Sequence, residues 1–204
     1  VGIIMPFNFP YLLFGWEAGA ALGAGNAVIL KPSELTAMSS LIMMECFDHL
    51  PKGLMQCIPG AIETGKALVG HDGVDGIAFT GSIAGGQAVA ETCASTFKRV
   101  LIEASGNDPF LVMPSADISI AAQAATFAAY ANCGQVCTSG ERFFVHNDVH
   151  DQFVDEVTRL AAGLRIGNGL DKVDMGPMVS KRERERYEAI LTRAQEQGAK
   201  LTHG

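Results

Sequence analysis

The sequence predicts an α/β fold built on a mostly parallel β-sheet. Short apolar runs alternate with helix-like segments through almost the whole chain, which is the pattern of βαβ units. Turn residues fall between the two kinds of segment, as 51–53 (Pro-Lys-Gly) does before a predicted strand. Right-handed crossovers bring the carboxyl ends of such strands to one edge of the sheet, where ligands bind. Functional residues are therefore expected immediately after the strands.

The first 105 residues are predicted to alternate between strand and helix. The predicted strands are Val1–Met5, Ala27–Leu30, Met55–Ile58, Gly76–Phe79 and Val100–Ile102. The predicted helices are Tyr11–Leu22, Thr36–His49, Thr64–Val69 and Gly85–Ser95. Pro10 suits the first turn of the first helix, because the N–H that proline lacks would be unpaired there. Thr36 is a candidate N-cap for the second helix.

A second series of elements follows Gly106, so a domain boundary is predicted near residue 105. The predicted strands are Phe110–Met113, Arg142–His146 and Lys200–Thr202. The predicted helices are Asp117–Asn132, Val149–Leu164 and Ser180–Gln197. A loop from Ile166 to Val179 joins the last two helices. The chain is thus divided into residues 1–105 and 106–204.

The composition is that of a well-buried globular protein with an acidic charge balance. Of the 204 residues, 48% are hydrophobic and 18% are charged, and the formal net charge is −7. An acidic chain without a basic cluster is a poor partner for nucleic acid or for an anionic membrane. The uncharged stretch Ile118–Gly140 is long enough to span a bilayer, but its polar side chains and alanines favour a packed helix.

The cysteines and the ends of the chain carry further information. Five cysteines is an odd number, and no Cys-x-x-Cys pair is present, so neither a disulfide framework nor a zinc site is expected. A reducing cytoplasm is the expected compartment. The chain opens in a strand-like run without an initiator Met and stops just after another such run. We expect it to be part of a longer polypeptide.

Two glycine-containing segments are candidates for contact with a nucleotide. The segment 23–25 (Gly-Ala-Gly) resembles the start of a dinucleotide fingerprint, but it follows a helix and precedes a strand. A helix C-cap is therefore the better interpretation. The segment 81–86, which begins with Gly81 and Ser82, lies between a strand and a helix, where its N–H groups could meet a phosphate. A plain turn is the alternative.

Three side chains could carry chemistry. Cys137 lies in a glycine-flanked segment after a helix, and is either a reactive thiolate or a small buried hydrophobe. Glu103 closes an apolar strand, as a base near a pocket or simply as an exposed strand end. Asn8 lies between two prolines, where an asparagine is usually a turn residue.

These segments, in this order and spacing, resemble the aldehyde dehydrogenase superfamily. The matching stretches are Pro6-Phe7-Asn8-Phe9-Pro10, Gly25-Asn26 leading to Lys31-Pro32-Ser33-Glu34, Phe79-Thr80-Gly81-Ser82, Glu103 with Gly106, and Gly134-Gln135-Val136-Cys137. Weaker matches follow at Ala116-Asp117 and Gly176-Pro177. The resemblance covers essentially the whole chain. It implies a Rossmann-like cofactor domain, partial, over 1–105 and part of an α/β catalytic domain over 106–204.

The resemblance also implies a reaction, the NAD(P)-dependent oxidation of an aldehyde to a carboxylic acid. Cys137 would attack the aldehyde carbonyl as a thiolate, giving a thiohemiacetal. The side-chain amide of Asn8 and the backbone N–H of Cys137 would form the oxyanion hole. Hydride transfer to the nicotinamide would leave a thioester, and Glu103 would activate the water that hydrolyses it.

A dinucleotide cofactor and a small aldehyde are the implied ligands. The residues expected to contact the cofactor are Pro6, Phe7, Lys31, Glu34, Gly81 and Ser82. Lys31 and Glu34 would hold the adenosine ribose, where a carboxylate repels a 2′-phosphate, so NAD is favoured with NADP as the alternative. Ser82 would contact the pyrophosphate at a helix N-terminus. The resemblance further implies a homodimer or homotetramer and no metal.

Two positions depart from the family pattern. Phe7 stands where the family usually has Trp, and Phe also occurs in branches that oxidise semialdehydes or pass the acyl group to coenzyme A. Ser105 stands where the family has the first glycine of Glu-Leu-Gly-Gly. If position 105 requires a positive φ, a serine there costs about 1–2 kcal/mol.

The departures leave two other interpretations open. One is a coenzyme A-acylating semialdehyde dehydrogenase, although those branches lack the general-base glutamate and the presence of Glu103 favours hydrolysis. The other is a non-catalytic family member that binds nucleotide. The run 107–117 is similar to that of some succinate-semialdehyde enzymes, which is a hint about the substrate.

Overall fold

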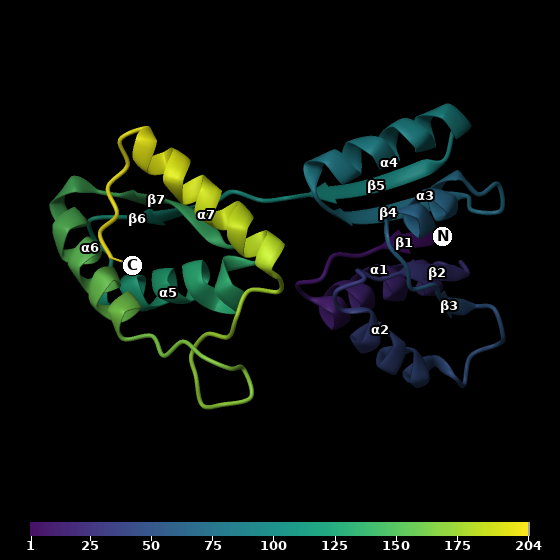
Figure 1. The fold of residues 1–204 in the computed structure, drawn as a ribbon, viewed down its shortest axis with the longest axis horizontal. Helices are drawn as coiled ribbons and strands as arrows, with labels where there is room; N and C mark the ends of the chain where they lie inside the picture. Colours follow the sequence, from purple (N-terminus) through teal and green to yellow (C-terminus); the bar gives the residue numbers. More distant parts are fainter. Residues whose placement is uncertain (204) are drawn as a thin grey trace. The chain divides into compact units, whose positions relative to one another are not determined.

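The structure is a computed structural model that describes residues 1–203. The chain divides into two compact units, the first ending at Ser105 and the second beginning at Gly106. The first unit contains a five-stranded sheet and the second a two-stranded sheet. Both units are α/β, as the sequence predicts (Figure 1).

All five strands of the first unit are parallel. They are β1 (Gly2–Ile4), β2 (Val28–Lys31), β3 (Met55–Cys57), β4 (Gly76–Gly81) and β5 (Arg99–Ala104), in the spatial order β3-β2-β1-β4-β5. The chain starts in the middle of the sheet, winds outward to β3, and then returns to the other side of β1. This is the strand order of a Rossmann-like sheet, and its switch point lies between β1 and β4.

Helices cover both faces of this sheet. They are α1 (Pro10–Gly23), α2 (Ala37–Met44), α3 (Ile62–Gly70) and α4 (Ile83–Thr96), with a 3₁₀ turn at Glu45–Phe47 after α2. The first two helices lie on one face and the last two on the other (Figure 1). Strands buried on both faces must be apolar at successive positions, and β1 meets this requirement. Ile3 packs in the cluster with α1, and Ile4 packs in the cluster with α3 and α4.

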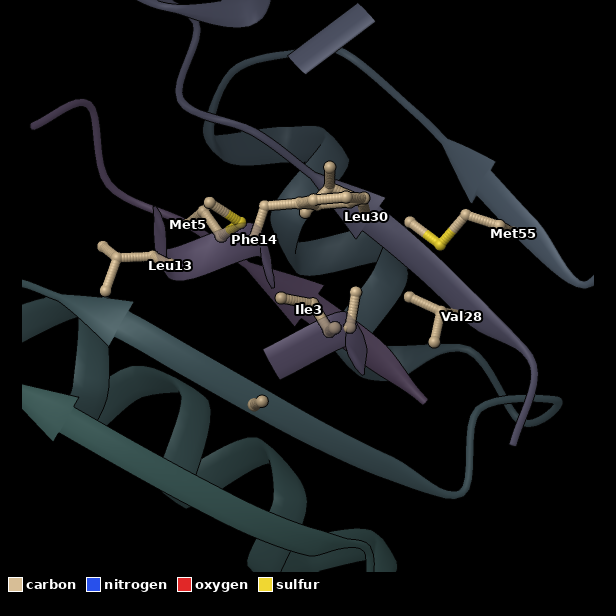
Figure 2. Packing of buried hydrophobic residues seen from close by; sticks show 9 residues of the cluster. Ile3, Met5, Leu13, Phe14, Val28, Leu30 and Met55 are labelled. Atoms are coloured by element: carbon tan, nitrogen blue, oxygen red, sulfur yellow. The ribbon is translucent and has the colours of Figure 1, made fainter. Parts of the chain in front are cut away.

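The core beneath α1 is centred on Phe14, which is fully buried. Figure 2 shows this ring beside Leu30 of β2, with Ile3, Val28 and Met55 along the same face. The ring also meets Phe47 edge-on, with 5.3 Å between the ring centroids. The 3₁₀ turn that follows α2 therefore contributes to the same core.

Local sequence explains where α1 begins and ends, but the capping of α2 differs from expectation. Pro10 occupies the first turn of α1, as predicted, and Gly25 follows the end of α1 with φ +83°, so the segment 23–25 is a helix C-cap. Thr36 does precede α2, yet its hydroxyl makes no capping bond and is buried without a hydrogen-bond partner within residues 1–203. The predicted helix 36–49 also ends early, because its α-helical part stops at Met44.

The second unit packs two helices against a parallel strand pair. Its elements are β6 (Asp108–Val112), α5 (Ile118–Tyr130), a 3₁₀ segment (Ala131–Gly134), β7 (Gly140–Val145), α6 (Asn147–Ala162) and α7 (Lys181–Glu196). Val112, Ala122 and Phe153 are at the centre of its core. Asp117 caps α5 and Ser180 caps α7, each through a side-chain oxygen that accepts a backbone N–H. Among residues 1–203, no helix is long and apolar enough to cross a bilayer.

The predicted strand Lys200–Thr202 is wrong. This segment follows α7 as irregular backbone and belongs to no strand. An apolar alternation becomes a strand only where another strand offers its backbone hydrogen-bonding groups. In the part of the chain that the structure describes, β6 and β7 pair only with each other.

Ser105 adopts a left-handed backbone conformation, with φ +70°. Its N–H donates to the carbonyl oxygen of Gly81 at 3.2 Å, so the residue is held in this conformation at the end of β5. A side chain in this region of φ costs about 1–2 kcal/mol relative to glycine. Serine, which stands at position 105 in place of the family's glycine, therefore strains the backbone there.

We predict that Ser105→Gly stabilises the complete protein, because it relieves this strain. The gain should be up to about 1 kcal/mol, since glycine also loses more backbone entropy on folding. In a protein more than twice as long as this chain, such a change raises the melting temperature by roughly 1 °C, measurable by circular dichroism. Ser105→Ala is the matched control, because it removes the hydroxyl and keeps the strain. Equal melting temperatures for Ser105→Gly and Ser105→Ala would contradict the prediction.

Candidate active site

The carboxyl-terminal edge of the five-stranded sheet collects most of the predicted site residues. Asn8 lies in the bend that follows β1, in the same loop as Pro6 and Phe7. Lys31 ends β2, and Ser82 follows β4. Because the strands are parallel, these positions share one edge. Asn8 and Ser82 follow the two strands, β1 and β4, that flank the switch point.

Lys31 is a buried lysine whose ammonium group donates a hydrogen bond to the backbone. Its side chain is only 5% exposed, and its Nζ donates to the carbonyl oxygen of Pro32 at 2.8 Å. Burial lowers the pKa of Lys31, and the nearby charge of Glu34 partly offsets that shift. Glu34 itself is exposed at the same edge. The pair thus places a cation and a carboxylate near each other.

The segment that begins with Gly81 and Ser82 forms a strand-to-helix turn. Ser82 caps α4, and its Oγ accepts the N–H of Gly85 at 3.2 Å. A Cβ at Gly81 or at Gly85 would come within 2.9 Å of the Phe79 ring, so both positions lack room for a side chain. This turn forms the N-terminus of a 14-residue helix, and the Phe79 ring packs against it. Such an end can receive a phosphate group.

Glu103 lies on the face of the sheet that α1 covers. It is an exposed residue on β5 and pairs in register with Thr80 of β4. The two side chains leave the sheet on the same side as Ala78, which packs against α1. Thr80 donates from its Oγ1 to Oε1 of Glu17 at 2.8 Å. Glu103, Thr80 and Glu17 all line one cavity of about 870 Å³ in the first unit.

Glu17 was not identified from the sequence as a site residue. It is the only charged residue in α1, whose sequence is otherwise apolar or small. That signal could have identified it, since a lone carboxylate in an apolar helix requires a partner. Its pKa is raised by burial, an effect that the Thr80 hydrogen bond opposes and the negative charge of Glu103 reinforces.

Cys137 occupies a tight turn in the second unit. The N–H of Ser139 donates to the carbonyl oxygen of Val136 at 3.1 Å, so Cys137 is the first central residue of a β-turn. The Ser139 hydroxyl donates to the carbonyl oxygen of Ala128 in α5 at 2.6 Å, and Ser139 is 2% exposed. The turn is therefore anchored to a helix, and Cys137 is partly accessible.

The residues before Cys137 form an unusual left-handed segment. Asn132, Cys133 and Gly134 have φ values of +51°, +60° and +68°. Two of the three are not glycine, so this geometry is strained. The strain is held by contacts to a distant loop, because the Gln135 Oε1 accepts the N–H of Val179 at 3.0 Å. Strain of this kind is common beside functional groups.

The Cys133 thiol is held by a hydrogen bond to the backbone. The Cys133 thiol donates to the carbonyl oxygen of Gly176 at 2.9 Å. Burial raises the pKa of Cys133, which keeps the thiol protonated. A protonated thiol engaged as a donor is a poor nucleophile. Cys133 therefore has a structural role.

Gly106 lies directly against the backbone of Cys137. A Cβ at position 106 would overlap the carbonyl oxygen of Cys137 and crowd its carbonyl carbon. The obstacle is backbone, which cannot move aside as a flexible side chain can. Any side chain at position 106 must therefore displace the turn that carries Cys137.

Within residues 1–203, no group of three or more His, Cys, Asp or Glu side chains is arranged to hold a metal ion. None of the cysteines within residues 1–203 forms a disulfide.

The chain matches the aldehyde dehydrogenase family over residues 1–204. The chain belongs to this family. It is 41% identical over 208 residues to DhaS of Bacillus subtilis (strain 168), covering 100% of this chain and 42% of that protein. It is 35% identical over 208 residues to a benzaldehyde dehydrogenase [NAD(+)] of Pseudomonas putida, covering 100% of this chain and 43% of that protein. The aldehyde dehydrogenase chain thus spans under half the length of these relatives.

A solved structure agrees with the fold of this aldehyde dehydrogenase chain. PnpE, in complex with nicotinamide adenine dinucleotide, superposes with a TM-score of 0.96 at 38% identity. The match covers 100% of this chain and 42% of PnpE. The Rossmann-like sheet predicted for the first unit is therefore confirmed.

We predict that Gly106→Ala slows the alkylation of Cys137 by iodoacetamide in the complete protein, because the added methyl group displaces the Cys137 peptide. The loss should be about tenfold or more, the effect of a misplacement near 1 Å on a reactive group. Peptide mass spectrometry over time gives the rate. Gly169→Ala is the control, since a Cβ at Gly169 meets open space. An unchanged rate in Gly106→Ala would refute the tight approach.

Proposed function

We propose that this chain is the central part of an NAD-dependent aldehyde dehydrogenase that oxidises an aldehyde to a free carboxylic acid. The observation that carries the proposal is the pair formed by Gly106 and the Cys137 turn. Glu103 is three residues before Gly106 in the chain, and three residues span at most about 11 Å. A short stretch of chain therefore links the proposed base to the turn that carries the proposed nucleophile.

The choice of Cys137 as nucleophile rests on its place in the family motif, since the chain belongs to that family. The Cys133 thiol is engaged with Gly176 and is kept protonated, as described above. Cys137 lies in the turn at the family's nucleophile position and is partly accessible. Its thiolate would add to the aldehyde carbon, forming a C–S bond and a negative oxygen. The side-chain amide of Asn8 and the N–H of Cys137 would stabilise that oxygen.

Oxidation and hydrolysis would complete the reaction. When bound, the dinucleotide accepts a hydride from the thiohemiacetal carbon. Glu103 would then take a proton from a water molecule, whose oxygen attacks the thioester carbon. The C–S bond breaks, the carboxylic acid leaves, and the Cys137 thiolate is restored. Glu103 favours this hydrolytic outcome over acyl transfer to coenzyme A.

The residues of the sheet edge fit a dinucleotide. Lys31 and Glu34 offer a cation and an exposed carboxylate after β2, which suits two ribose hydroxyls. Ser82 is exposed at the N-terminus of α4, where backbone N–H groups suit the pyrophosphate. Pro6 and Phe7 are in the loop after β1, on the path between these two positions along the edge.

The remaining features of the proposal concern the whole protein. A reducing cytoplasm is the proposed compartment, and a homodimer or homotetramer is the expected assembly. The substrate is an aldehyde, and benzaldehyde, phenylacetaldehyde, betaine aldehyde and succinate semialdehyde form a suitable panel, since the first three name the substrates of relatives.

We predict that Cys137→Ala abolishes NADH formation by the complete protein on every aldehyde of this panel, because no thiohemiacetal forms. Glu103→Gln should retain a first burst of one NADH per site and then slow by about 10²–10⁴-fold, the usual contribution of a general base. Stopped-flow absorbance at the NADH band measures both phases.

Cys133→Ser is the matched control for the nucleophile, since serine keeps a donor for the Gly176 carbonyl oxygen. It should retain the burst. Turnover by Cys137→Ala, or a thioester product that appears only when coenzyme A is added, would contradict the proposed reaction.

We predict that Glu34→Gln increases the use of NADP, because it removes the carboxylate that repels a 2′-phosphate. The KM for NADP should fall by about tenfold, equivalent to roughly 1.4 kcal/mol, while the KM for NAD rises. Steady-state kinetics with both cofactors measure the change. Glu91→Gln, an exposed carboxylate on α4, is the control. An unaltered preference in Glu34→Gln would place the ribose elsewhere.

A further inference from the structure

Three polar side chains form a connected group on the α1 face of the sheet. Glu17 comes from α1, Thr80 from the end of β4, and Glu103 from the register position beside Thr80 on β5. The Thr80 hydroxyl already donates to Glu17, with 2.8 Å between Oγ1 and Oε1. Neighbouring strands lie about 4.8 Å apart, so paired side chains on one face are neighbours. Thr80 is therefore hydrogen-bonded to Glu17 and lies next to Glu103 on the same face of the sheet.

One oxygen of Glu17 is left without a partner. Its Oε2 is buried and makes no hydrogen bond within residues 1–203. Burying a carboxylate oxygen without a partner is costly, and the contact to Thr80 uses only the other oxygen. Packing therefore does not explain why a glutamate occupies this position in an apolar helix. The side chain lines the same cavity as Glu103, through which a proton could leave.

We propose that Glu17 is a positioning residue for deacylation, which accepts through the Thr80 hydroxyl the proton that Glu103 takes from water. This inference rests on the proposed function, because it concerns the hydrolysis step of that reaction. It assigns a role to a residue outside the nucleophile, the oxyanion hole and the general base.

The transfer is balanced in protons and needs no further reactant. Glu103 forms an O–H bond with the proton removed from water. The Thr80 hydroxyl gives its own proton to Oε1 of Glu17 and takes the proton of Glu103. Glu103 is then a carboxylate again, and Glu17 releases its proton into the cavity. The direction agrees with the observed hydrogen bond, in which Thr80 is the donor.

Charge and burial around Glu17 determine how the transfer depends on pH. The other charged side chains that line the cavity are Asp75, Arg99 and Glu103. Asp75 precedes β4 and Arg99 begins β5, so each is at the opposite end of its strand, roughly 13 Å or more from Thr80 or Glu103. Of these charged groups, Glu103 is therefore the one close to Glu17.

Glu17 must be ionised to accept a proton. Burial raises the pKa of Glu17, and repulsion by Glu103 adds to the shift while the Thr80 bond opposes it. Deacylation should therefore slow as the pH falls through this raised pKa, at a higher pH than for a carboxylate in water. Above that pKa the Glu17 carboxylate is ionised and can accept the proton, so deacylation is no longer slowed by protonation of Glu17.

The test compares Glu17→Gln with the wild type in the complete protein, using stopped-flow NADH formation between pH 5 and pH 9 on the best aldehyde of the panel. Glutamine keeps an acceptor for Thr80 but cannot take up a proton. The burst should keep its rate and amplitude, and the steady phase should fall by about tenfold or more. Acetate added to the buffer should accelerate the steady phase of the variant but not of the wild type.

Thr80→Val and Thr80→Ser form a second, matched pair. Thr80→Val is isosteric and lacks the hydroxyl, so it should reproduce the slow steady phase, whereas Thr80→Ser should restore it. A Glu17→Gln enzyme with the steady rate and pH profile of the wild type overturns the inference. So does a variant whose slow phase acetate fails to accelerate, since that indicates a purely structural role. Failure of the proposed function is distinguishable, because the wild type itself would then show no NADH burst.

Discussion

The pairing of β1 with both β2 and β4 is the constraint on which the first unit depends. This short strand is only three residues long, yet it occupies the centre of the sheet and contributes apolar side chains to both cores. Full burial of an isoleucine stabilises a fold by about 1.5–3 kcal/mol, so Ile3 and Ile4 together hold helices on both faces. Because β1 is central, the loop after it reaches the switch point, and that is where Asn8 lies.

A second constraint is backbone geometry near the chemistry. Ser105, Asn132 and Cys133 are non-glycine residues with positive φ, and each is within a few residues of a proposed catalytic group. Such positions cost of order 1–3 kcal/mol each and persist where surrounding contacts over-determine them. Here those contacts are hydrogen bonds to Gly81 and Gly176 and the close approach of Gly106 to the Cys137 carbonyl group. The strained residues lower the stability of the fold locally, and the contacts that hold them also fix the turn that carries Cys137.

The sequence predicted the order and type of most elements because apolar periodicity and turn residues are local signals. The sheet, the C-cap at Gly25 and the Ser82 turn follow from them. Long-range relations did not follow. The predicted strand 200–202 does not form because it has no partner strand, and no local pattern indicates whether a partner exists. The contact between Gly106 and Cys137 joins residues that are far apart in the chain. The Glu17–Thr80 bond spans 63 positions, so only its tertiary setting indicates a role.

Trapping the acyl enzyme tests most directly whether Cys137 is the nucleophile and Glu103 the general base. The complete Glu103→Gln protein is mixed with NAD and benzaldehyde, quenched with acid within the burst, digested, and analysed by mass spectrometry. The account predicts an acyl group on the peptide that carries Cys137, confined to that thiol and absent from Cys133. An acyl group on Cys133, or continued NADH formation with no acylated peptide, would contradict it.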